Sequence, residues 1–249
     1  GTLTGTTITS CSNRVFPQFQ NIQMVESAGV SRYDALTVQL TKRFSRVVQF
    51  SSNYTLSKST DDSPEQNMTT GGIQGLVLSD PTNRAFDKGR SFADQRHTFV
   101  MSLVAHPRPA FANRVLRYLF NHNVFGVIAN ANSGETFNII SGTDLNRDGI
   151  ATSDRPVGIR RNSGTTPPQF DVDLCYSRFF NFGERYKLGI SGELQNLFNT
   201  NSIVGFNNVA VNTSLVTGEL VGGLPDFKAR NQSSFQESRQ FQLGLKFLF

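Results

Sequence analysis

The chain has 249 residues, a mass of 27.6 kDa and a mean hydropathy of −0.29, with 22 Phe, 5 Tyr and no Trp. Its apolar runs are far shorter than the roughly 20 residues of a membrane-spanning helix, which excludes a helical membrane protein but not one built from alternating strands. The net charge of +5 arises from 24 Lys and Arg scattered along the chain, so we expect no nucleic-acid partner.

Alternation of apolar and polar residues predicts seven long strands. In chain order they are expected at about 33–44, 48–57, 96–106, 121–133, 170–177, 187–195 and 240–249. The last is the clearest, because Phe241, Leu243, Leu245, Phe247 and Phe249 share one face. Strands of this length exceed the usual 5–6 residues and suit the roughly 9–11 residues that a membrane barrel strand needs.

The connections between these strands are of two kinds that alternate along the chain. Short or medium connections fall at 44–47, 107–120 and 181–185, and long polar ones at 59–93, 134–167 and 198–236. This asymmetry is typical of an up-and-down barrel in a bacterial outer membrane, with long external loops and short periplasmic turns. The last strand then runs inward and Phe249 ends at the periplasmic rim.

The strand count predicts that residues 1–249 are the last part of a larger barrel. Single-chain bacterial barrels close with an even number of strands, and an unpaired strand edge in lipid is not viable. We therefore expect residues 1–32 to be an external loop or partial strand, 33–249 to form the seven strands, and other residues to complete the barrel. The alternative is that 1–32 supply an eighth strand. The start at Gly1, without Met or a signal peptide, favours a fragment or processed product.

Several short stretches, taken in order, resemble TonB-dependent outer-membrane receptors, in particular the Oar-like group with a carboxypeptidase-regulatory-like domain. The stretches are Phe16-Pro17-Gln18-Phe19, Ser31-Arg32-Tyr33-Asp34-Ala35-Leu36, Lys42-Arg43-Phe44, Asn53-Tyr54-Thr55-Leu56-Ser57-Lys58, Asp94-Gln95-Arg96-His97, Ser133-Gly134, Gly142-Thr143-Asp144 and Glu193-Leu194-Gln195-Asn196-Leu197-Phe198-Asn199. The terminal Phe249 resembles the signal that the barrel-assembly machinery reads.

The resemblance implies a barrel of about 22 strands with an N-terminal plug, driven by the TonB complex of the inner membrane. Such receptors import siderophores, cobalamin, glycans or peptides. The expected partners are outer-membrane lipid, the remaining strands and plug, and the TonB complex through an N-terminal region that this sequence does not contain. No transport residue carries over, and the imported substrate stays open. The absence of Trp departs from the usual aromatic girdle, which Phe44, Phe179, Phe182, Tyr186 and Phe247 would have to form.

One candidate metal site is a calcium-like loop in the predicted segment 134–167. Asp144, Asn146, Asp148, Ile150 and Asp154 follow the D-x-N-x-D-G pattern, in which alternate oxygen ligands converge on Ca²⁺ and a glycine permits the turn. The twelfth position is Arg155 instead of a bidentate Glu, so the match is partial. The alternative is an external turn in which Asp154 and Arg155 form a local ion pair.

The other polar residues favour structural roles. Asp171 and Asp173 share a strand face, with Glu193 across a hairpin and Lys187 near, and a charged barrel lumen explains them better than acid–base catalysis. Asp94 to His97 are expected to order the outer end of a strand. A pairing of Cys11 with Cys175 is not expected, because one lies in a loop and the other in mid-strand.

The sequence therefore favours a structural part of an active-transport barrel, located in the outer membrane with extracellular loops, and no enzyme. The alternative is a self-contained small outer-membrane barrel or a surface adhesin with binding loops. A soluble β-sandwich that binds glycans is the third class, and the segregated loops argue against it.

Overall fold

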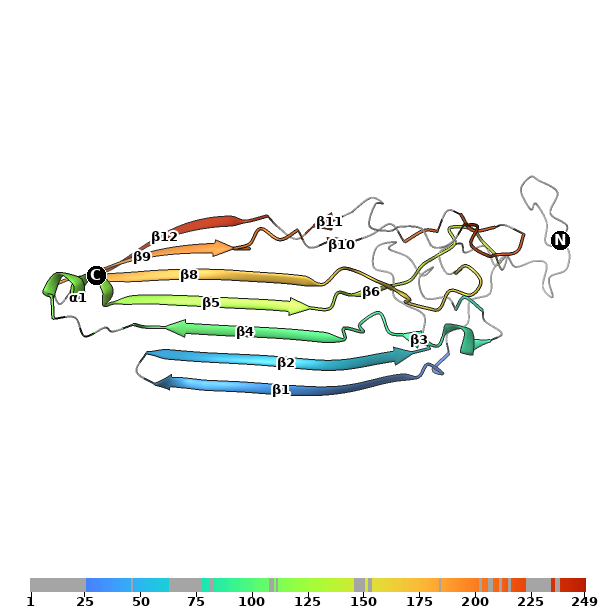
Figure 1. The fold of residues 1–249 in the computed structure, drawn as a ribbon, viewed down its shortest axis with the longest axis horizontal. Coiled ribbons are helices and arrows are strands. Elements are labelled where there is room, and N and C mark those ends of the chain that lie inside the picture. Colours follow the sequence, from blue (N-terminus) through green and yellow to red (C-terminus); the bar gives the residue numbers. More distant parts are fainter. Residues whose placement is uncertain are drawn as a thin grey trace.

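The computed structural model describes residues 26–45, 47–62, 78–80, 83–107, 110, 112–145, 151, 154–183, 185–201, 203–205, 208–210, 212–214, 216–222, 234–235 and 238–249. Seven long strands lie side by side in chain order (Figure 1). They are β1 (Ser31–Ser45), β2 (Val48–Asp61), β4 (His97–Ala105), β5 (Asn123–Asn132), β8 (Gln169–Phe182), β9 (Tyr186–Gln195) and β12 (Gln240–Leu248). Each pairs antiparallel with the next, so the predicted all-β, up-and-down order is confirmed.

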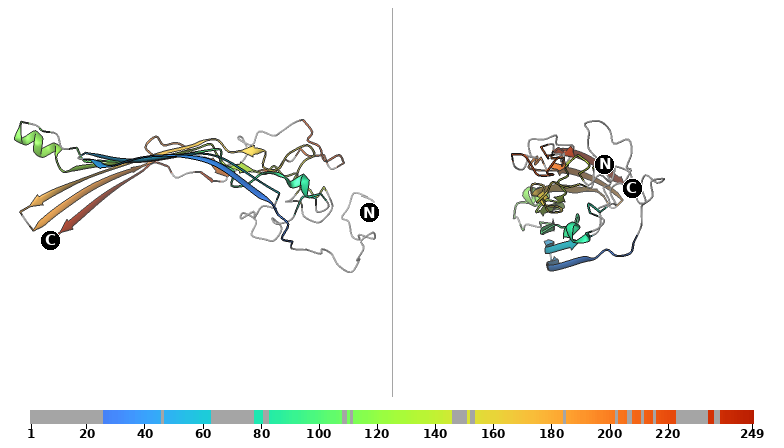
Figure 2. Two further views of the ribbon diagram at one scale, coloured as in Figure 1. Left: turned by 90° about the horizontal axis from the view of Figure 1, so that it is seen from below. Right: turned by 90° about the vertical axis from the view of Figure 1, so that its right-hand side faces the viewer.

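The connections are segregated to the two ends of the sheet, as the loop lengths predicted (Figures 1 and 2). The described residues of 46–47, 106–122 and 183–185 lie at the turn end, and the described residues of 62–96, 133–168 and 196–239 lie at the loop end. Short elements lie within the long loops: η2 (Arg84–Asp87), β3 (Gly89–Arg90), β6 (Thr136–Phe137), β7 (Gly164–Thr165), β10 (Ile203–Gly205) and β11 (Ser234–Phe235). At the turn end, the medium connection contains a helix, α1 (Arg114–Phe120), which the alternation did not predict.

The register joins the apolar sides of all seven strands into one continuous surface, here called the apolar face. Because side chains alternate with a period of two, residues paired across strands share a face. One row runs through Val38, Tyr54, Phe99, Ala131 and Phe170 on five successive strands. The remaining rows of this face contain Leu36, Leu40, Phe50, Leu56, Met101, Leu103, Ala105, Phe125, Val127, Ala129, Val172, Leu174, Tyr176, Leu188, Ile190, Leu194, Phe241, Leu243, Leu245 and Phe247.

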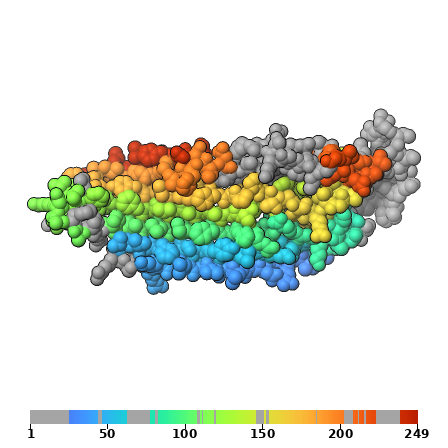
Figure 3. Space-filling view, viewed as in Figure 1, coloured from blue at the N-terminus to red at the C-terminus, as the bar shows by residue number. Residues whose placement is uncertain are grey.

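The opposite side, here called the polar face, carries mostly hydroxyl, amide and charged side chains. Typical cross-strand neighbours on it are Thr37 with Thr55, whose hydroxyls lie 3.1 Å apart, and Asn130 with Asp171. The sheet is a single curved layer in which the strands follow one another from blue to red (Figures 2 and 3). Among the described residues, no helix is long and apolar enough to cross a membrane.

The apolar face is largely uncovered. Leu243 and Leu245 on β12 remain 70% and 78% exposed, and the described part of the chain buries very few apolar side chains. Ile139 and Ile140 lie in the second long loop, beside Ala210 in the third. Ala129 and Val172 are buried where they pair on the apolar face of β5 and β8. The buried polar side chains lie mainly in the loops and at the loop end of the sheet.

The structure places some of the predicted girdle residues on the apolar face, and their girdle role stays a prediction. Tyr186 and Phe247 stack on the apolar face at the turn end with ring centroids 6.0 Å apart, and Phe182 pairs with Tyr186. The prediction for Phe179 is wrong, because Phe179 pairs with Gly189 on the polar face. A one-residue step along a strand reverses the face, so of the adjacent Phe179 and Phe180 only Phe180 lies on the apolar face. The side chain of Phe44 lies outside the described residues.

Candidate functional site

The first two long loops pack together at the loop end around buried charges. We call this arrangement the loop assembly and define it by the described residues of 59–94 and 134–166. Its buried side chains are mainly polar: Asp87, Asp94, Thr136, Ser141, Asp154, Arg155, Arg161 and Asn162. Buried polar groups are stable only when hydrogen bonds replace the water they have lost, so the partners of these side chains determine how the loops are held.

Arg155 is the centre of the loop assembly. Its Nη1 donates to Asp87 Oδ1 at 2.6 Å and to Ser79 Oγ at 2.9 Å, and its Nη2 donates to the Phe86 carbonyl at 2.7 Å. The guanidinium also lies 4.6 Å from the centroid of the Phe86 ring. The side chains of Arg155 and Asp87 are only 2% and 4% exposed. The planar fork of arginine makes this many-partner contact possible, and lysine lacks it.

A second arginine links the loops to the sheet. Arg161 forms a salt bridge with the carboxylate of Asp61, the last residue of β2. The same Nη1 lies 3.3 Å from the Asp87 carbonyl oxygen, to which it donates. Arg161 thus connects the end of β2 with Asp87, the residue whose carboxylate also binds Arg155.

Asp94 orders the outer end of a strand, as the sequence predicted, and this strand is β2. Its Oδ1 accepts from the Ser59 amide at 2.6 Å and its Oδ2 accepts from Arg90 Nε at 2.8 Å. His97 Nδ1 lies 2.8 Å from the Tyr54 hydroxyl, across the β2–β4 pair. These contacts hold the first long loop against the loop end of the sheet.

Asn162 closes the contact between the two loops. It is completely buried, has a φ of 50°, and donates through Nδ2 to the Arg90 carbonyl at 2.8 Å. Asparagine tolerates this left-handed backbone better than most residues. Thr136 adds a second link, since its hydroxyl donates to the Ser91 carbonyl at 2.9 Å.

A pocket of about 410 Å³ opens beside Arg155 where all three long loops meet. The third loop is joined here by a hydrogen bond from the Val157 amide to the Gly218 carbonyl, at 2.7 Å. The wall residues are Ser79, Asp80, Phe86, Leu145, Asp154, Arg155, Val157, Val216, Thr217 and Gly218. The volume and the mixture of apolar walls with a few polar groups suit a small ligand.

The calcium-like loop is only partly described, and calcium binding stays a prediction. Asn146, Asp148 and Ile150 lie outside the described residues. Asp154 is buried, and its Oδ2 accepts a hydrogen bond from the Leu145 amide, which braces the loop. Within the described ranges, no group of three His, Cys, Asp or Glu residues is placed to hold a metal. Arg155 forms its ion pair with Asp87, so the alternative of a local Asp154–Arg155 pair is wrong.

The carboxylates of the polar face are more dispersed than the sequence suggested. Asp171 and Asp173 share a face, but Glu193 pairs with Cys175, so it lies diagonal to Asp173. Asp173 Oδ1 accepts from the Asn196 amide at 2.9 Å, which is a structural contact. Lys187 is six residues from Glu193 along β9, roughly 20 Å away, and is not a neighbour of these groups. Cys175 is a free thiol and Cys11 lies outside the described residues.

Sequence reasoning missed the role of Arg155 in the loop assembly, and it did not single out Arg161 and Asn162 at all. Arg155, Arg161 and Asn162 stand in an ordinary polar stretch, and no local pattern shows that they are buried. Helix α1, in contrast, has a recognisable signal: Asn113 precedes it, and its Oδ1 accepts from the Val115 amide at 2.8 Å. An asparagine before an apolar run is a usual helix start.

Comparison with known proteins gives one family. A family model described as an outer membrane beta barrel domain matches residues 1–160, which is more than half of the chain. No curated protein matches the chain. No solved structure matches it either. The matched residues include the strands β1 to β5 and the greater part of the loop assembly.

Proposed function

Because the chain belongs to the outer-membrane β-barrel domain family, we propose that it forms part of the wall of a larger barrel that imports a nutrient. Family membership supports a barrel protein of the outer membrane. The proposal adds that the barrel is a TonB-dependent receptor of the Oar-like group, with a siderophore, glycan or peptide as its cargo. In this proposal the chain is structural and has no enzymatic reaction.

The observation that carries the proposal is the division of the sheet into one apolar and one polar face across seven strands. An outward apolar band and an inward polar wall are what a barrel in lipid requires. β1 and β12 are the two edges of the sheet, and in a closed barrel each edge pairs with a further strand. β1 is 15 residues long and is exposed at every described side chain, so it offers a long edge for such pairing.

The orientation follows from the same arrangement. The loop end faces the cell exterior and the turn end faces the periplasm, as long and short connections do in bacterial barrels. The apolar face meets lipid, and the polar face lines a lumen that holds the plug. The TonB complex acts through an N-terminal region. The loop assembly and its pocket then stand at the outer mouth, where cargo arrives.

The test is native mass spectrometry of the detergent-extracted outer-membrane protein that carries this chain, with and without the periplasmic domain of TonB. The proposal expects an assembly larger than 27.6 kDa that contains a plug and further strands and that binds the TonB domain. A lone, folded 27.6 kDa species would contradict it and would favour the small barrel or adhesin. A large assembly that does not bind the TonB domain would contradict TonB-dependent transport but not the larger barrel.

A further inference from the structure

Helix α1 is amphipathic, and its apolar side chains are exposed. At about 100° per residue, Val115, Leu116, Tyr118 and Phe120 spread over one broad arc, and Arg114 and Arg117 share the other side. Val115 and Tyr118 are 65% and 61% exposed. A helix of seven residues is too short to persist on its own, so its cap and its contacts must hold it in place.

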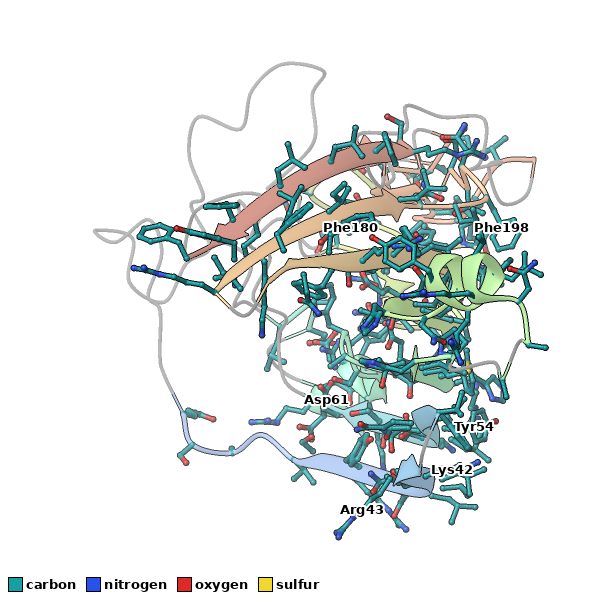
Figure 4. All side chains as sticks on the ribbon, turned by 90° about the vertical axis from the view of Figure 1, so that its left-hand side faces the viewer. Lys42, Arg43, Tyr54, Asp61, Phe180 and Phe198 are labelled. Carbon is teal, nitrogen blue, oxygen red and sulfur yellow. The ribbon has the colours of Figure 1, made fainter. Side chains whose placement is uncertain are left out.

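The helix lies on the apolar side of the sheet. Arg178 belongs to the apolar face, since it follows Tyr176 by two residues on β8, and its Nη2 donates to the Tyr118 carbonyl at 2.8 Å. The Arg178 guanidinium also lies 4.7 Å from the centroid of the Phe180 ring and 5.5 Å from that of Tyr118. Figure 4 shows α1 on the same side of the sheet as Tyr54 and Phe198.

The polar side of α1 is basic. Arg114 and Arg117 are exposed, and among the described residues neither has a carboxylate within ion-pair distance. Arg185 lies in the neighbouring turn, over the Tyr186 ring at 5.9 Å. Apolar and aromatic side chains next to arginines, at the margin of an apolar wall, match the boundary between acyl chains and anionic headgroups.

We propose that α1 is an interfacial helix that binds anionic phospholipid of the inner leaflet of the outer membrane. Val115, Tyr118 and Phe120 enter the acyl boundary, while Arg114 and Arg117 contact the phosphates. This inference rests on the proposed function in two respects: the apolar face meets lipid, and the turn end faces the periplasm. It adds a lipid-binding site to the turn end, beyond the role of a connection between β4 and β5.

The first test places a tryptophan at position 118 by Tyr118→Trp in the full protein, because the 249-residue chain contains no Trp. The protein is reconstituted in phosphatidylethanolamine–phosphatidylglycerol vesicles whose acyl chains are brominated either near the headgroup or near the tail end. The proposal expects the fluorescence gained by the substitution to be quenched mainly by the shallow bromines. No quenching by either lipid would overturn it.

Two further variants serve as controls. Lys187→Trp places the reporter on the polar face at the same end and is expected to escape quenching. Leu245→Trp places it in the middle of the apolar face and is expected to be quenched by the deep bromines. If Leu245→Trp is quenched and Tyr118→Trp is not, the proposal of an interfacial helix is wrong and the lipid contact of the apolar face stands. If neither is quenched, the lipid contact of the proposed function fails as well.

The second test concerns the charge. The double variant Arg114→Gln/Arg117→Gln is expected to bind spin-labelled phosphatidylglycerol roughly fivefold more weakly per arginine, about 25-fold in total, with no change for phosphatidylcholine. The matched control is Arg43→Gln/Lys187→Gln, which removes the same charge from the polar face at the same end. Equal losses in both double variants, or a loss of self-association instead of lipid binding, would overturn the proposal.

Discussion

Arg155 and Asp87 form an almost completely buried ion pair, whereas Arg32 and Asp34 form one that is open to solvent, with side chains 76% and 60% exposed. The shortest N–O distances are similar, 2.6 Å for Arg155–Asp87 and 2.8 Å for Arg32–Asp34, but the surroundings are very different. Removing one partner of a buried pair leaves an uncompensated charge, but an exposed charge is simply hydrated. Burial, and not the presence of a pair, therefore sets the cost of losing it.

The first prediction uses this contrast. Arg155→Ala is expected to lower the free energy of opening of the loop assembly by about 3–5 kcal/mol, because Asp87 stays buried without its partner. Hydrogen–deuterium exchange of residues 79–87 and 154–162 measures the effect. Arg32→Ala is the control and is expected to change nothing measurable. Equal exchange in the two variants would contradict the central role of Arg155.

The second prediction concerns two glycines with positive φ, Gly134 at 84° and Gly158 at 81°. Gly158→Ala is expected to cost about 1 kcal/mol from the backbone alone, since no atom lies within 4 Å of the new Cβ. Gly134→Ala is expected to cost clearly more, because its Cβ would collide with the Thr166 carbonyl oxygen. Heat-dependent gel mobility of the folded barrel reports both. Equal losses would mean that the close approach at Gly134 does not matter.

At the scale of elements, α1 shows how a short helix is kept in a connection. Seven residues are below the length at which a helix is stable alone, so the end contacts are decisive. Asn113 Oδ1 accepts from the Val115 and Leu116 amides at 2.8 and 3.4 Å, and Arg178 holds the Tyr118 carbonyl. One contact is local in sequence and the other comes from β8.

The third prediction tests the local contact. Asn113→Ala is expected to destabilise α1 by about 1 kcal/mol, because two amides lose their acceptor. The readout is faster amide exchange over residues 115–120, with exchange in β4 and β5 unchanged. Asn113→Asp retains an accepting oxygen and is expected to exchange like the parent protein. If Asn113→Ala also exchanges like the parent, tertiary contacts alone hold the helix.

At the scale of the whole molecule, the sheet is a wall with two chemically different sides. Adjacent residues on one strand point to opposite faces of the sheet. The register aligns apolar residues with apolar residues on the neighbouring strands, so each face keeps one chemical character. A single layer of this kind cannot bury its apolar side chains by itself. In the proposed barrel, lipid on the apolar side and a filled lumen on the polar side would provide what a second layer provides in a globular protein.

The fourth prediction compares Val127 and Ile128 in the middle of β5. Val127→Arg puts a charge on the apolar face and is expected to cost about 2–4 kcal/mol in a bilayer. Ile128→Arg puts the same charge on the polar face, where Ile128 is 49% exposed, and is expected to have little effect. Guanidinium unfolding in phospholipid vesicles measures both. The reverse order of stability would mean that the two faces have been assigned the wrong way round.

The sequence by itself determined the seven strands, their up-and-down order and the face of most side chains. These features are local: a period of two assigns a face, and the lengths of successive connections assign an end. The prediction failed for Phe179, because Phe179 and Phe180 are adjacent and the regular pairing of β8 with β9 puts only Phe180 on the apolar face. Calcium binding at Asp144 to Asp154, the division of the chain at residue 33, and the transport class stay predictions.

Only the tertiary structure decided which charges of the long loops meet. Asp87 and Arg155 are 68 residues apart, and Asp61 and Arg161 are 100 apart. The long loops contain several arginines, and no local sequence pattern shows which of them pairs with Asp87 or with Asp61. Burial selects the partner, because an arginine gives up its hydrating water only where carbonyl and carboxylate oxygens replace that water. Such a set of oxygens comes together only when the loops have packed.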